Sequence, residues 1–76
     1  MPQTPRNRYQ ERKAKILAGS LLQAAIAADV PLSNLPRMAA SMTHAQWVSL
    51  SLANGLPVAT RPARIFTIAL LQKVAA

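Results

Sequence analysis

The stretch over residues 33–56 constrains the fold most, because it carries the signals that begin and end a helix. Thr43 is placed to cap a helix over residues 43–54 with its hydroxyl, and Gln46, three residues later, can reach back to the Thr43 N–H. Gly55 follows directly and supplies the left-handed exit that a helix end favours. These signals predict a well-bounded helix in the middle of the chain.

A shorter helix should precede it. Ser33 is a suitable cap for a helix over residues 33–40, and Pro36 is tolerated because it falls in the first turn. Trp47 lies one turn into the following helix, where it can pack on Met42. We therefore expect Trp47 to be a core residue and the two helices to meet at a tight corner.

The corner between these helices resembles the consensus of the helix-turn-helix DNA-binding proteins. That consensus has a small residue, a turn residue, a hydrophobic residue and then a Ser or Thr that opens the recognition helix; the chain has Ala40, Ser41, Met42 and Thr43 in this order. The positions that the family buries next hold Trp47 and Leu50. The chain departs from the family at three positions, where an apolar residue, a small residue and a glycine are replaced by Pro36, Arg37 and Ser41.

The resemblance implies that one face of the helix over residues 43–54 meets the major groove of DNA, through Thr43, His44, Ala45, Val48 and Ser49. Hydroxyl and imidazole groups can hydrogen-bond base edges, and small apolar side chains can contact thymine methyl groups. Two simpler interpretations stay open. Val48 and Leu52 lie on one stripe, which is typical of a packing surface, and His44 is in a first turn, where a side chain is often simply solvated.

The charge balance favours a polyanionic partner. Nine Lys and Arg against two acids, Glu11 and Asp29, give a net charge of +7 over 76 residues. Nucleic acid is the first candidate and an anionic membrane surface the second. The candidate phosphate contacts are cations in the N-terminal segment and near predicted helix starts: Arg6, Arg8, Arg12, Lys13, Arg37, Arg61 and Arg64. The simpler interpretation is a solubilising basic tail and ordinary surface charges.

The two ends of the chain complete the predicted architecture. Residues 1–8 are expected to be a flexible basic arm, since cations near a helix N-terminus oppose its dipole. Apolar residues recur at helical spacing over residues 9–28, and Val30-Pro31 should end this helix. Thr60 is the expected cap of a last helix over residues 61–74.

The last helix carries apolar side chains on more than one face. It is therefore either the central helix of the bundle or a helix shared with a second subunit. A homodimer would meet through Ile65, Ile68 and Leu71, and the sequence offers neither a disulfide nor a structural metal to support so small a core.

Catalysis is not expected from this set of residues. The chain has one His, no Cys and two isolated acids, and its two glycines form no phosphate-binding loop. No cofactor and no metal are expected. The sequence also lacks a recognisable signal peptide or membrane-spanning stretch, so we expect a cytoplasmic protein, associated with the nucleoid if it binds DNA.

The sequence thus predicts an all-α, four-helix domain over residues 9–76, preceded by the arm over residues 1–8. The favoured function is sequence-specific DNA binding by a small dimeric transcriptional or replication regulator, such as a repressor of phage or plasmid type. Two alternatives stay open. One is a small inhibitor or adaptor that binds a protein through the apolar C-terminal helix, and the other is a peripheral membrane binder that uses the basic first helix.

Overall fold

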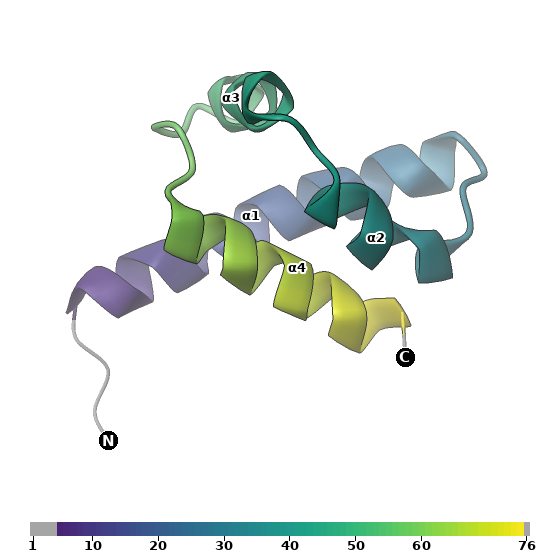
Figure 1. Cartoon of the computed structure of the whole chain (residues 1–76), viewed down its shortest axis with the longest axis horizontal. Coiled ribbons are helices and arrows are strands. Elements are labelled where there is room, and N and C mark those ends of the chain that lie inside the picture. The colour runs from purple at the N-terminus through teal and green to yellow at the C-terminus, as the bar shows by residue number, and fades with distance from the viewer. Residues whose placement is uncertain (1–4, 76) are drawn as a thin grey trace.

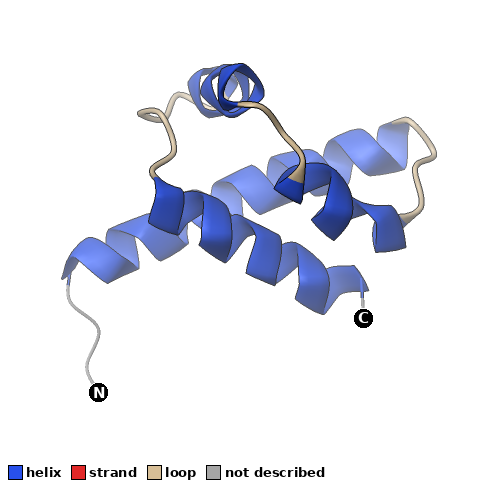
Figure 2. Ribbon diagram, in the orientation of Figure 1, coloured by secondary structure: helices blue, strands red, loops and turns tan. Residues whose placement is uncertain are grey.

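The computed structural model describes residues 5–75. This part of the chain is helical throughout, with short connections and no strand (Figures 1 and 2). The elements in chain order are α1 (Pro5–Ala27), a 3₁₀ turn η1 (Leu32–Asn34), α2 (Leu35–Ala40), α3 (His44–Ala53) and α4 (Arg61–Ala75). The predicted all-α, four-helix architecture is confirmed.

Helix α1 begins earlier than the sequence pattern indicated. It starts at Pro5, within the segment predicted to be an arm, and residues 1–4 lie outside the described residues. Proline is favoured at a first helical position because its φ is already helical. At the other end Asp29 adopts a left-handed φ of 59°, and the Val30 N–H donates to the Ala25 carbonyl at 2.9 Å, so the helix closes as in a Schellman motif.

The segment before α2 also differs in detail from the prediction. Ser33 does not cap a helix but lies inside η1. Asn34 occupies the position before α2, and its side chain makes no capping hydrogen bond. Pro36 falls in the first turn of α2, where the missing N–H costs nothing because it has no helical partner.

Three helices form a layer that supports the fourth. α1 and α4 lie side by side, and α2 packs on α4. α3 is seen end-on above them in Figure 1, so its axis runs across the axes of α1 and α4. One core cluster joins α1, α2 and α4 through Ala18, Ala25, Leu35, Ala39 and Leu71. A second cluster joins α1, α3 and α4 through Leu17, Trp47, Ala59 and Ala63.

Helix α4 is central to the bundle. Its Ala63, Thr67 and Leu71 are buried, and Ile68 and Leu70 are partly buried against the first cluster. Thr60 caps this helix as predicted, because its Oγ1 accepts a hydrogen bond from the Ala63 N–H at 3.4 Å. One face of α4 is therefore buried within the chain, while Ile65 and Val74 remain exposed on the helix.

Candidate functional site

Helix α3 begins with the capping box that the sequence predicted. The Gln46 N–H donates to Thr43 Oγ1 at 3.2 Å, and the Thr43 N–H donates to Gln46 Oε1 at 2.8 Å. At its C-terminal end Gly55 has a φ of 68°, and the Leu56 N–H donates to the Ser51 carbonyl at 3.0 Å. Both ends are thus fixed by local hydrogen bonds.

One edge of α3 holds the helix to the rest of the molecule. Trp47 is 3% exposed and packs with Leu17 of α1 and Ala63 of α4, so its predicted core position is confirmed. Ser51 is fully buried. Its hydroxyl donates to the Trp47 carbonyl at 2.8 Å and accepts from the Ala59 N–H at 3.1 Å, which ties the helix to the chain that leads into α4.

A second attachment links the start of α3 to α4. The Arg64 Nε–H donates to the Ala59 carbonyl at 3.1 Å, and its Nη2 donates to His44 Nδ1 at 2.8 Å. The guanidinium carbon lies 5.7 Å from the centre of the Trp47 ring, within the range of a cation–π contact. Since arginine cannot accept a hydrogen bond, His44 Nδ1 must be the acceptor and its ring proton must sit on Nε2.

The opposite edge of α3 faces solvent. Among the predicted base contacts, Thr43, His44, Ala45 and Ser49 are exposed and Val48 is half-buried. Leu52, the other member of the proposed packing stripe, is also exposed. The described contacts therefore leave the outer face of α3 uncovered, and that face carries no charged residue.

The predicted phosphate contacts lie in different environments. Arg8, Arg12, Arg37 and Arg61 are exposed, Arg64 is half-buried in the attachment described above, and the side chain of Arg6 lies outside the described residues. Lys13 differs from all of these, because it is 3% exposed and its Nζ lies 5.2 Å from the centre of the Tyr9 ring. Lys15, which was not among the predicted contacts, is exposed on α1. It lies at helical spacing from Arg8 and Arg12, so the three cations share one outer stripe of α1.

The three residues predicted at a dimer interface also lie in different environments. Ile65 is 56% exposed, whereas Ile68 packs partly on the first core cluster and Leu71 is 1% exposed. Leu71 therefore serves the core of its own chain.

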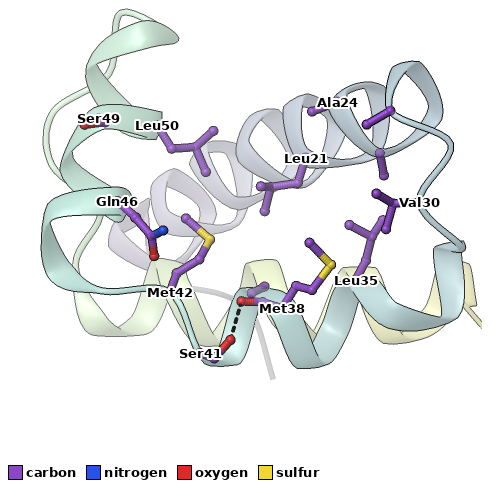
Figure 3. A pocket seen from close by; sticks show the side chains of 13 residues that line it. Leu21, Ala24, Val30, Leu35, Met38, Ser41, Met42, Gln46, Ser49 and Leu50 are labelled. Atoms are coloured by element: carbon purple, nitrogen blue, oxygen red, sulfur yellow. Dashed lines mark hydrogen bonds between the residues drawn. The ribbon is translucent and has the colours of Figure 1, made fainter.

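The structure contains a hollow that the sequence did not indicate (Figure 3). It measures about 770 Å³ and lies between α1, α2 and α3. Its lining is mainly apolar and includes Leu21, Val30, Leu35, Met38, Met42 and Leu50. Sequence periodicity gives no signal for such a hollow, because it arises from the spacing between helices rather than from any one of them.

Other kinds of site are not supported by the described residues. Within residues 5–75 no group of three or more His, Cys, Asp or Glu lies close enough to hold a metal ion. No helix among these residues is both long and apolar enough to cross a membrane. Comparisons with protein families, with characterised proteins and with solved structures give no match to this chain.

Proposed function

We propose that this protein binds duplex DNA, with α2 and α3 acting as a helix-turn-helix and α3 as the recognition helix. The observation that carries the proposal is the outer face of α3, which is exposed and uncharged and belongs to a strongly basic chain. From residue 30 to residue 76 the sequence has four cations and no acid. A DNA phosphate approaching α3 would therefore meet no carboxylate from α2, α3 or α4.

The dimensions of α3 suit a DNA groove. Its ten residues span about 15 Å at the helical rise, and the major groove of DNA, about 12 Å wide, admits one α-helix. The three-residue connection between α2 and α3 is of the length that joins the helices of this motif.

Each exposed residue of α3 has a definite chemical capacity. His44 offers an Nε2–H donor, because Arg64 occupies its Nδ1, and this donor matches the N7 and O6 acceptors of guanine. The Ser49 hydroxyl can donate or accept, and the Ala45 methyl group suits a thymine methyl. Thr43 uses its oxygen as an acceptor for the helix cap and retains its O–H as a donor. Val48 is half-buried, so its contact with DNA should be smaller than that of the exposed residues.

The phosphate contacts are assigned to the exposed cations. These are Arg8, Arg12 and Lys15 on the outer stripe of α1, Arg37 on α2 and Arg61 at the start of α4. Lys13 is left out because it is buried. If these residues meet phosphates, log K should fall linearly with log[salt], and each contact removed should reduce the slope by about 0.9.

The proposal is tested by placing one negative charge on α3. Ala45 and Ala69 are both exposed helical alanines, on α3 and α4 respectively. Ala45→Glu should weaken binding to a duplex selected from a random pool by more than about tenfold, because like charges in contact cost several kcal/mol. Ala69→Glu makes the same change in net charge and should weaken binding by about twofold or less at moderate salt.

Two results would contradict the proposal. One is the absence of salt-dependent binding to any duplex of the pool, and the other is an equal effect of the two alanine substitutions. A matched RNA duplex in the same titration separates DNA binding from general affinity for polyanions.

We further propose that the protein binds DNA as a homodimer, which would present two recognition helices about 34 Å apart, one DNA turn. Of the residues first considered for the interface, Ile65 is the exposed one. Ile65→Glu should therefore convert a dimer to a monomer in light scattering without unfolding the chain. The alternative function, protein binding through the apolar faces of α4, has less surface available because Thr67 and Leu71 are buried.

A further inference from the structure

The hollow between α1, α2 and α3 is open to solvent, since its lining includes exposed residues such as Ala24, Met38 and Gln46. α1 forms one wall and α2 the opposite wall, while α3 and the chain around Val30 close the two ends. Its floor includes Ala25, Leu35 and Ala39, which belong to the first core cluster. The hollow is therefore a bowl rather than a groove that runs through the surface.

This shape and lining determine what can occupy it. None of the lining residues carries a charge, and burying a charged group there would be unfavourable. The volume lies within the ~300–1,000 Å³ of small-molecule sites.

We propose that this bowl is a binding site for a compact, neutral and largely apolar small molecule. Met38 and Met42 stand at its lower wall (Figure 3), and methionine side chains adapt to ligands of different shape. Because no lining residue is charged, the bowl favours an uncharged ligand, although the chain as a whole has a charge of +7.

One polar group in the bowl supplies orientation. Gln46 Oε1 is engaged by the Thr43 N–H, and the amide nitrogen lies on the side of the hollow in Figure 3. The Ser41 hydroxyl is already donating to the Met38 carbonyl at 3.0 Å, and the Ser49 hydroxyl, although Ser49 is part of the lining, is directed toward the outer side of α3 in Figure 3. The ligand should therefore carry a hydrogen-bond acceptor, such as a ketone or ester carbonyl, that meets the Gln46 amide.

A ligand bound in the bowl would also stabilise α3. Met42 packs against both core clusters, and Gln46 and Leu50 bring the lining onto α3 itself. A bound molecule would thus fill the space beside a helix that is held along one edge. Amides of residues 46–50 should exchange more slowly with solvent when the bowl is filled.

The experiment uses prodan, a neutral naphthalene ketone whose emission reports an apolar environment. We expect saturable binding with one site per chain, together with NMR shifts of the Met38 and Met42 methyl groups. Ala24 lines the bowl and is exposed, whereas Ala27 is exposed on the same helix outside the lining. Ala24→Phe should fill the bowl and weaken binding by about tenfold or more, equivalent to 1.4 kcal/mol or more, and Ala27→Phe should leave the affinity unchanged.

A second pair of variants tests the polar contact without altering volume. Gln46→Glu keeps the capping box, since glutamate serves equally well at that position, but it removes the amide donor and adds a charge to the bowl. It should weaken prodan binding by about tenfold, while Gln23→Glu, an exposed residue of α1 outside the lining, should have no effect.

Three results would overturn the inference. They are no binding of prodan up to its solubility limit, equal binding by Ala24→Phe and Ala27→Phe, and a wild-type dimer that Ala24→Phe dissociates, since the bowl would then be covered by a second copy. Prodan binding is measured without DNA, so its failure would leave the proposed DNA binding standing.

Discussion

Replacing Ser51 with alanine should show how α3 is held in place. Ser51 is fully buried, and its hydroxyl bridges two parts of the chain, donating to the Trp47 carbonyl and accepting from the Ala59 N–H. The substitution removes one oxygen and leaves almost no cavity. It deprives the buried Ala59 N–H of its partner, whereas the Trp47 carbonyl lies within α3 and can retain its helical bond.

The magnitude follows from that one unpaired donor. A buried donor left without a partner costs about 1–3 kcal/mol, and the better helix propensity of alanine returns about 0.5 kcal/mol. We expect a net loss of about 0.5–2.5 kcal/mol in the free energy of unfolding. For a domain of this size each kcal/mol lowers the melting temperature by about 4–8 °C, so the expected decrease is about 2–20 °C.

The assay is urea and thermal unfolding followed by circular dichroism, with Ser49→Ala as the matched control. Ser49 is an exposed serine of the same helix, so its replacement should change stability by less than about 0.5 kcal/mol. If Ser51→Ala is as stable as Ser49→Ala, the bridge to Ala59 does not exist in solution and α3 is held by its other contacts, among them those of Trp47, Leu50 and Arg64.

Substitutions at three further positions test the remaining contacts. Trp47→Ala should cost about 3–5 kcal/mol and abolish the cooperative unfolding transition, whereas an unchanged melting temperature would mean that α3 is oriented differently. Asp29→Gly should raise the free energy of unfolding by about 0.5–1 kcal/mol and Asp29→Ala should lower it, because glycine relieves the left-handed backbone at this position and alanine does not; equal values would refute the helix end described. Arg64→Met should lower the free energy of unfolding by about 1–2 kcal/mol. ¹⁵N NMR of this variant should show the His44 ring proton distributed over both nitrogens, whereas the contact with Arg64 holds it on Nε2 in the wild type. An unchanged tautomer in the variant would contradict the contact.

The features that the sequence predicted correctly depend on neighbours in the chain. The capping box of Thr43 and Gln46, the glycine exit at Gly55 and the cap at Thr60 each involve residues within a few positions of each other, so their spacing alone identifies them. Trp47 could be placed in the core because it follows the cap by one turn. Element type and the bounds of α3 and α4 were therefore accessible from local signals.

The features that were missed depend on which faces of the helices meet. Lys13 and Lys15 are two residues apart in one basic segment, yet the first is buried and the second exposed, because Lys13 shares the inner face of α1 with Leu17. Leu71 was predicted at a dimer interface because the sequence does not show that α4 packs against α1 and α2. The contact between Arg64 and His44 joins residues 20 positions apart, and no local pattern indicates it.

The start of α1 shows how two local rules compete. Cations near a helix N-terminus are unfavourable, which predicted an arm through residue 8. The structure instead extends the helix to Pro5, and Gln10 is buried where its Oε1 accepts a hydrogen bond from Thr60 Oγ1 at 2.8 Å. That contact lies within the helix already predicted from the apolar pattern, so the extension to Pro5 reflects the preference for proline at a first helical position, set against a surface electrostatic penalty of less than about 1 kcal/mol.

The attachment of α3 by one edge separates its stability from its proposed contacts. Trp47 and Ser51 lie on the inner edge, and Ala45 lies on the outer edge. Ser51→Ala should therefore lower the free energy of unfolding without changing the side chains of the outer edge. The affinity for DNA of this variant at low temperature should then remain close to that of the wild type. Ala45→Glu should do the reverse, because a glutamate in the first turn favours the helix but opposes a phosphate backbone. If both variants lose stability and binding together, the outer edge of α3 is part of the packed structure, and the proposal that α3 is a recognition helix fails.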